Sequence, residues 1–279
     1  MTTTDTGAQA MTARTTQSAA AAGSRPVRDT MTMLRRNIKN QLRYPVTIFA
    51  IIGIPVLFLL LFVYVFGGAL SQAVDTTGSK NYVDYVLPGL IIMTAAAGLL
   101  GTSTSTSVDM TEGIITRFRT MAIFRPSILI ARVISSVLQT LASMLFVFVV
   151  ALLMGLSPNA TPIDWLAIVG LLALISFALS WLGLAFGLAA KTIDAASNAP
   201  FPLILLPLVG SGIVPTDSMP TVVRWFAEYQ PFTPMIETLR GLLYGSAIGN
   251  SALLTFGWCL GISVLGFVWS VRAFNRDRS

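Results

Sequence analysis

Six long runs of this sequence contain no charged residue, and these runs limit the possible folds more than any other feature. A bilayer core about 30 Å thick needs about 20 apolar residues of helix to cross it. Only 11% of the 279 residues are charged, whereas soluble domains carry about 25%. Because the runs are continuous and not alternating, they predict helices, which satisfy their own backbone hydrogen bonds in lipid. We therefore expect an all-α polytopic membrane protein with six transmembrane helices, over residues 46–66, 86–107, 133–156, 165–190, 195–216 and 252–271.

The basic residues predict how these helices are oriented. With the N-terminus in the cytosol, only Lys80, Arg224 and Arg240 of the 18 basic residues fall in outer segments, whereas the 12 acidic residues divide equally. Lys and Arg near helix ends stay on the cytosolic side. We therefore expect a plasma (inner) membrane protein with both termini in the cytosol. Its parts would be a disordered cytosolic tail (1–27), one membrane domain (28–275) and a short cytosolic tail (276–279).

A basic amphipathic segment, residues 28–45, precedes the first run. Its apolar residues recur at helical spacing, which predicts an interfacial helix lying in the headgroup layer. The alternative is a charge cluster that only sets the topology. The basic residues of this segment are Arg35, Arg36, Lys39 and Arg43.

Hydroxyl groups gather in the second and third runs. The second run ends in GTSTSTS, and the third carries polar residues on one helical face from Ser136 to Ser143. Such residues either form a small-residue packing face between helices or line a polar path. The residues that would line a path are Thr102, Thr104, Ser136, Gln139 and Thr140. The fourth run contains GLAFG, a GxxxG pattern that permits close helix contact.

The fifth run contains four prolines and two glycines between Pro200 and Pro215, which predicts a short, broken span. The following segment, residues 216–245, is too charged to span the membrane and too apolar for a free loop. It predicts two short helices that dip into the outer leaflet, an outer hairpin in which Glu237 and Arg240 pair one turn apart. The hairpin is either a static lid or a gate with this pair as its latch.

Residue types exclude much chemistry. The chain has no histidine, and its single cysteine excludes a disulfide within the chain. No GxxxxGK[ST] loop is present in the sequence. We therefore expect no catalytic, cofactor-binding or metal-binding residue and no enzymatic activity in this chain alone. The net charge of +6 is gathered on the predicted cytosolic side, which argues against nucleic acid as a partner.

Between the second and third runs lies a charged island, EGIITRFRTMAIFRPS, residues 112–127. It predicts either a short amphipathic helix that contacts a partner or a loop that only sets the topology. The residues of interest in it are Glu112, Gly113, Arg117, Phe118, Arg119 and Arg125.

Two segments resemble the permease subunit of type-2 ATP-binding-cassette (ABC) exporters, especially the daunorubicin-resistance-like branch. The first runs from Asp109 to Arg132 and contains the charged island. The second matches in order and spacing at Pro215, Met219-Pro220, Trp225, Pro231, Thr233-Pro234 and Leu239-Arg240-Gly241. In topology the likeness covers about residues 28–275. The chain departs from the family at Ala122, where a proline is common, and has Pro126 after Arg125.

This resemblance implies a permease that exports an amphipathic drug-like, lipid or glycolipid-type molecule, with a role in multidrug or antibiotic resistance. ATP and magnesium would be held by a separate ABC ATPase subunit, present in two copies. The permease would pair with itself or with a related permease. The charged island would be the coupling helix that docks on the ATPase, and residues 28–45 the connecting helix.

The family's outer re-entrant helices would correspond to the outer hairpin here, with Pro215, Trp225, Glu228, Pro231, Thr233, Pro234, Glu237 and Arg240. Two alternatives are an ATPase-independent secondary transporter and a structural membrane subunit. A secondary transporter would need ionisable residues inside its spans, which the six runs lack.

Overall fold

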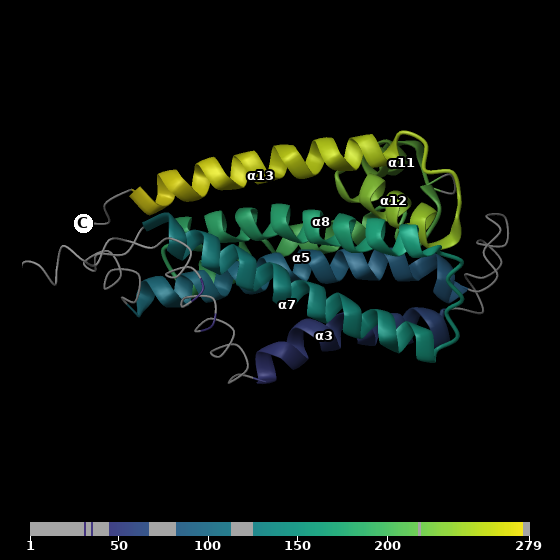
Figure 1. Ribbon diagram of the computed structural model, residues 1–279, viewed down its shortest axis with the longest axis horizontal. Coiled ribbons are helices and arrows are strands. Elements are labelled where there is room, and N and C mark those ends of the chain that lie inside the picture. Colours follow the sequence, from purple (N-terminus) through teal and green to yellow (C-terminus); the bar gives the residue numbers. More distant parts are fainter. Residues whose placement is uncertain are drawn as a thin grey trace, which may run out of the picture.

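A computed structural model describes residues 31, 35, 45–66, 82–112, 125–216 and 219–275 of the chain, without the side chains of 45–52 and 125–128. Every regular element in these ranges is a helix (Figure 1). The elements are α3 (Pro45–Leu60), the π-helical turn η1 (Leu61–Val65), α5 (Tyr82–Thr111), α7 (Arg125–Leu153), α8 (Pro162–Ala189), α9 (Ile193–Asn198), α10 (Phe201–Val209), α11 (Thr221–Tyr229), α12 (Phe232–Tyr244) and α13 (Ser251–Asn275).

Four of these helices, α5, α7, α8 and α13, are long and apolar enough to cross a membrane. The predicted all-α class is thus confirmed for the described part of the chain. The first and fifth predicted spans correspond to shorter apolar helices, so the count of six spans stays a prediction. The fifth run is broken, as its prolines predict: α9 and α10 are separate, and α10 ends three residues before Gly212.

Helix α5 is the central element and is buried along most of its length. It contacts α3, α7, α8, α9, α10 and α12, whereas α13 packs on α8 and α12. In Figure 1, α5 and α8 run through the middle of the molecule, with α13 along one side and α3 and α7 along the other.

The closest contact in the bundle joins α5 to α8 through the GLAFG segment. A Cβ atom added to Gly183 would lie 2.5 Å from the carbonyl oxygen of Leu99, and one added to Gly187 would lie 2.5 Å from that of Ser103. On the opposite side of α8, Gly266 of α13 approaches the backbone of Leu182 equally closely, with its added Cβ 2.7 Å from the amide nitrogen. The GxxxG pattern therefore serves packing within the chain, since only glycine permits these backbone approaches.

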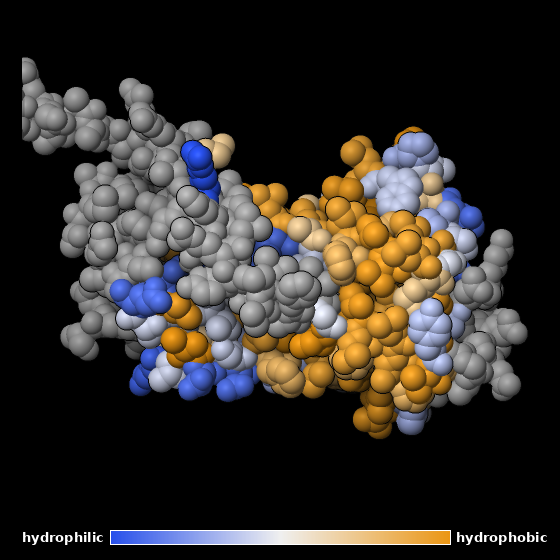
Figure 2. All heavy atoms as spheres, turned by 90° about the horizontal axis from the view of Figure 1, so that it is seen from below, coloured by the Kyte–Doolittle hydropathy of each residue, from blue (hydrophilic) through white to orange (hydrophobic). Residues whose placement is uncertain are grey.

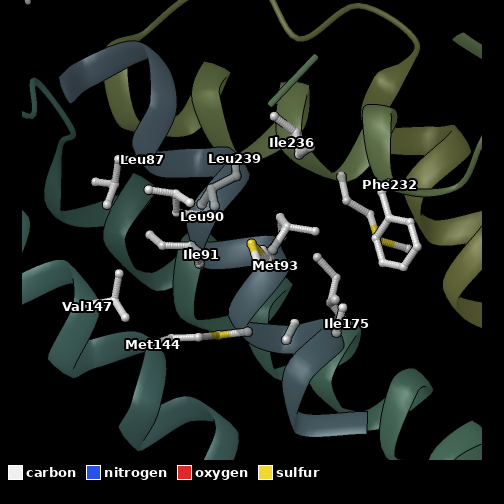
Figure 3. Close-up of a cluster of buried hydrophobic side chains, with 14 of the residues drawn as sticks. Leu87, Leu90, Ile91, Met93, Met144, Val147, Ile175, Phe232, Ile236 and Leu239 are labelled. Atoms are coloured by element: carbon white, nitrogen blue, oxygen red, sulfur yellow. The ribbon is translucent and has the colours of Figure 1, made fainter. Parts of the chain in front are cut away.

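Two apolar clusters fill the bundle. The larger one surrounds α5, where its side chains meet those of α7, α8 and α12 (Figure 3). The smaller one lies at the end where α5 stops and α7 starts, and it contains Leu129, Val133, Trp181, Leu184, Leu188 and Phe274.

The outside of the bundle is also apolar. On α13, Leu253, Leu260 and Leu265 are each more than two-thirds exposed, and α3 and α7 expose further large apolar side chains. Figure 2 shows a broad apolar area on the face that carries α3 and α7. Soluble monomers rarely expose continuous apolar patches larger than a few hundred Å², so this surface fits a bilayer.

Replacing Gly187 tests the α5–α8 contact. We expect Gly187→Ala to lower the thermal unfolding temperature of the purified protein, because overpacking of this kind costs about 1–3 kcal/mol. Gly170, on the same helix, is the matched control, since a Cβ atom there meets nothing within 4 Å. Gly170→Ala should leave stability unchanged or raise it. Equal unfolding temperatures for Gly187→Ala and the wild type would show that the helices do not approach this closely.

Candidate functional site

An ion pair joins the two helix ends that flank the charged island. Asp109, near the end of α5, and Arg132, near the start of α7, approach with 3.1 Å between Oδ2 and Nη1. Both side chains are largely buried, with 21% and 11% of their surface exposed. Met110 and Leu129 place the smaller apolar cluster beside them. The pair therefore joins the end of α5 to the start of α7, the two points between which the charged island lies.

Most residues of the predicted coupling helix lie outside the described residues. Glu112 is exposed in the turn after α5, where its amide donates to the carbonyl of Val108. Arg125 begins α7, and Pro126 follows in the first turn, where proline is tolerated. Gly113, Arg117, Phe118 and Arg119 are not in the described ranges, so contact with a partner stays a prediction.

The predicted interfacial helix is also described only in part. Arg35 is helical and exposed, as is Met31. Arg36, Lys39 and Arg43 lie outside the described residues. The position of this segment in the headgroup layer therefore stays a prediction, and a charge cluster that only sets the topology stays the alternative.

Three of the proposed path-lining residues are buried in the single chain. Thr102 donates to the carbonyl of Gly98 and lies against Gly183, so it belongs to the α5–α8 contact. Thr140 of α7 packs directly on Gly98 of α5, and Ser136, one turn earlier, is buried too. Packing between helices accounts for these contacts.

The other two path-lining candidates, Thr104 and Gln139, are partly exposed. The hydroxyl of Thr104 lies 3.1 Å from that of Ser197 in α9. Next to it, Ser103 donates to the carbonyl of Ala196 at 2.7 Å. These bonds tie α9 to α5, and a role in lining a path stays a prediction for Thr104 and Gln139.

Two short helices, α11 and α12, are present where the outer hairpin was predicted. Thr233 closes the turn between them, because its hydroxyl donates to the carbonyl of Ala227 and accepts from the side-chain amide of Gln230. Pro231 and Pro234 lie at the start of α12, where a missing N–H costs little. Pro215 precedes the hairpin and is partly buried. That the hairpin dips into the outer leaflet stays a prediction.

Helix α11 exposes an apolar face, with Trp225 65% exposed. Its Glu228 forms an ion pair with Arg224 one turn earlier, with 2.7 Å between the atoms. Both of these charged side chains are more than 40% exposed.

The predicted pair between Glu237 and Arg240 is wrong. Arg240 Nη2 donates to the carbonyls of Ser211 at 2.6 Å and Tyr85 at 3.2 Å, and its guanidinium lies 4.1 Å from the centre of the Tyr85 ring. Glu237 instead accepts a bond from the Ser251 hydroxyl at the start of α13. The two side chains leave α12 toward different neighbours, because α5 lies on one side and α13 on the other.

Asp84 is a buried charge that the sequence reasoning missed. The second apolar run starts at residue 86, whereas α5 begins at Tyr82, so Asp84 lies in its first turn and inside a candidate span. Its carboxylate accepts from the amide of Ser157, in the loop between α7 and α8. A negative side chain at a helix N-terminus is favourable. The expectation that no span contains an ionisable residue is therefore wrong.

Tyr244, at the end of α12 and outside the four candidate spans, lies near both Asp84 and Arg240. Burial, and secondly the Asp84 carboxylate, raise the pKa of its phenol, and Arg240 opposes this only in part. Tyr244 therefore stays protonated. Asp84, Tyr85, Arg240 and Tyr244 together form a polar cluster at the hairpin end of α5.

Among the described residues, no group of three His, Cys, Asp or Glu side chains could hold a metal.

Residues 28–244 match the family of ABC-2 type transporters, and the chain belongs to this family. It is a membrane-embedded, multi-pass permease, as its resemblance predicted. The chain is similar to the daunorubicin resistance ABC transporter permease protein DrrB1 of Streptomyces coeruleorubidus, with 27% identity over 236 residues, 81% of this chain and 80% of that protein. It is also similar to a probable doxorubicin resistance ABC transporter permease protein, DrrC, of Mycobacterium tuberculosis, with 21% identity over 243 residues, 86% of this chain and 85% of that protein.

The Asp109–Arg132 pair can be tested by charge exchange. We expect Asp109→Asn to destabilise the protein by about 1–3 kcal/mol, because it removes the carboxylate that pairs with a largely buried guanidinium. The exchange Asp109→Arg with Arg132→Asp should recover part of this loss. Glu228→Gln, which breaks the exposed pair on α11, is the control and should cost less than about 1 kcal/mol. Thermal unfolding of the purified variants measures these effects, and equal losses for the two sites would contradict the assignment.

Proposed function

We propose that this chain is the permease subunit of an ABC exporter that moves an amphipathic drug-like, lipid or glycolipid-type molecule out of the cell. The match to ABC-2 type transporters over residues 28–244 supports this function most strongly. The names of the two relatives, which refer to daunorubicin and doxorubicin resistance, support a drug-like cargo and a role in antibiotic or multidrug resistance.

ATP and magnesium would act on a separate nucleotide-binding subunit, because the sequence of this chain has no phosphate-binding loop. The permease itself is then not an enzyme. Two copies of the ATPase would serve a homodimer or a heterodimer of permeases. The lengths of the apolar runs support six spans, and the distribution of basic residues supports an orientation with both termini in the cytosol. The plasma membrane is the proposed location.

The position of the Asp109–Arg132 pair supports a mechanical route from the ATPase into the membrane. A force on the charged island would reach the ends of α5 and α7 together, because the pair joins them. Helix α5 contacts most of the other described helices, so a displacement of α5 would also move the residues of α8, α10 and α12 that pack on it. Coupling through one central helix is therefore the mechanism that the packing favours.

Export and coupling can be tested together. Cells that carry the chain and its co-purifying ATPase should retain less doxorubicin than cells with a catalytically inactive ATPase. Reversing the charges at Arg119 and Arg125 together should abolish this difference while the protein remains inserted, because each charged contact contributes about 1–3 kcal/mol to docking. Arg224→Gln, on the opposite side of the membrane, is the matched control.

Two results would contradict this scheme. If the double reversal exports as well as the wild type, docking does not use the charged island. If no ATPase co-purifies with the wild-type chain, the chain is not an ABC exporter subunit.

Cysteine labelling tests the predicted topology. With Cys259 replaced by Ala, a cysteine at Ser79 should react with a membrane-impermeant maleimide added outside intact cells. Cysteines at Ser127 and Ser279 should react only after the cells are opened. External labelling at Ser127 would rule out six spans with cytosolic termini.

A further inference from the structure

The turn that follows α10 contains backbone groups that no helix can satisfy. We call residues 210–214 the outer turn. Ser211 is 3% exposed, and in a continuing helix its carbonyl would accept from the amide of residue 215. That residue is Pro215, which has no N–H group. Within a bilayer an unpaired carbonyl is costly, so the chain must supply a donor from elsewhere.

Arg240 of α12 supplies this donor. Its Nη2 lies 2.6 Å from the carbonyl oxygen of Ser211 and 3.2 Å from that of Tyr85, so one guanidinium bridges the outer turn and α5. The centre of the Tyr85 ring lies 4.1 Å from the guanidinium carbon, so the ring also stabilises the cation through a cation–π contact. A second bond to the turn comes from the Tyr82 hydroxyl, which donates to the carbonyl of Ile213 at 3.4 Å.

The outer turn rests on α5 without any side chain between them. A Cβ atom added to Gly89 of α5 would lie 2.6 Å from the Cα atom of Gly212. On the other side of the turn, a Cβ atom on Gly210 would lie 2.7 Å from the hydroxyl of Thr233. The backbone of the turn is therefore held between α5 and α12, and the bonds from Arg240 are the strongest polar link across this contact, because they are charge-assisted.

We propose that Arg240 is a positioning residue for transport: it clasps the outer turn onto α5 and keeps the outer end of the pathway closed between turnovers. Release of cargo then requires Arg240 to leave the Ser211 carbonyl. A hydrogen bond to a charged group can bias a two-state equilibrium by about ten- to hundredfold, which is enough to keep the turn closed and still allows ATP-driven opening. The clasp itself is independent of the proposed export, whereas its opening during transport rests on that function.

The accessibility of residue 211 tests the clasp at rest. The Ser211 hydroxyl has no protein partner among the described residues, so Ser211→Cys in a Cys259→Ala background is a mild probe. With Arg240 intact, a membrane-impermeant maleimide should label this cysteine slowly from outside. We expect Arg240→Met to raise the labelling rate about tenfold or more, and Arg240→Lys to raise it less, because lysine keeps the charge but lacks the planar guanidinium whose Nη2 reaches both carbonyls.

Tyr82→Phe is the matched control, because it removes a longer, uncharged bond to the same turn and should change the rate little. Tyr85→Leu, which keeps Arg240 but removes the ring beneath it, should raise the rate and provides the same test if Arg240→Met does not accumulate. Unchanged labelling in inserted, thermally stable Arg240 or Tyr85 variants would overturn the clasp, whatever happens to export.

The transport arm uses the permease with its ATPase in right-side-out vesicles loaded with ATP. Turnover should raise the labelling of the wild-type background and leave that of Arg240→Met unchanged, while ATP hydrolysis by the variant continues and its export falls. If Arg240→Met retains full export, the clasp does not control release and the proposal is wrong. If ATP leaves the wild-type labelling unchanged while export continues, the proposed opening is wrong. If ATP drives neither labelling nor export in the wild type, the exporter function fails and the clasp at rest stands.

Discussion

The direct backbone contact between α5 and α8 at Gly183 and Gly187 sets the spacing on which the other helices depend. Apolar side chains gain little by leaving lipid for other apolar side chains, so helices in a membrane associate through close packing and interhelical hydrogen bonds. Two glycines one turn apart provide such packing here. Helix α13 approaches the opposite side of α8 at Gly266 in the same way. The bundle is therefore arranged around α5 and α8, whose separation is small because the glycines at their contact have no side chain.

Helix α5 connects the two ends of the protein that matter for function. At one end Asp109 holds the start of α7, and at the other the Tyr85 carbonyl and ring receive Arg240. The 30 residues of α5 correspond to a rod about 45 Å long. A displacement imposed at the charged island would thus reach the outer turn through a single rigid element, which links the proposed ATP-driven step to the proposed clasp.

Most hydroxyl groups of α5 bond to carbonyls of their own helix, as Thr94, Thr102 and Thr106 do. Such bonds satisfy the hydroxyl within its own helix and do not link helices. Other hydrogen bonds of the described residues do cross between elements, such as those of Ser103 with Ala196, Ser270 with Trp181, and Arg240 with Ser211.

The sequence by itself determined the helical class, the break in the fifth run, the two short helices after it and the membership of the ABC-2 family. The first three features depend on local properties, namely the length of apolar runs and the positions of Pro and Gly, whereas the family follows from the resemblance of residues 109–132 and 215–241 to its permeases. The tertiary structure decided the partners of the buried charges. Arg240 was predicted to bond to Glu237, three residues away, but it bonds to groups 29 and 155 residues away. Spacing along one helix shows which side chains could meet, but the low-dielectric interior selects the pairing that leaves the fewest carbonyls without a donor, and that depends on which helices lie side by side.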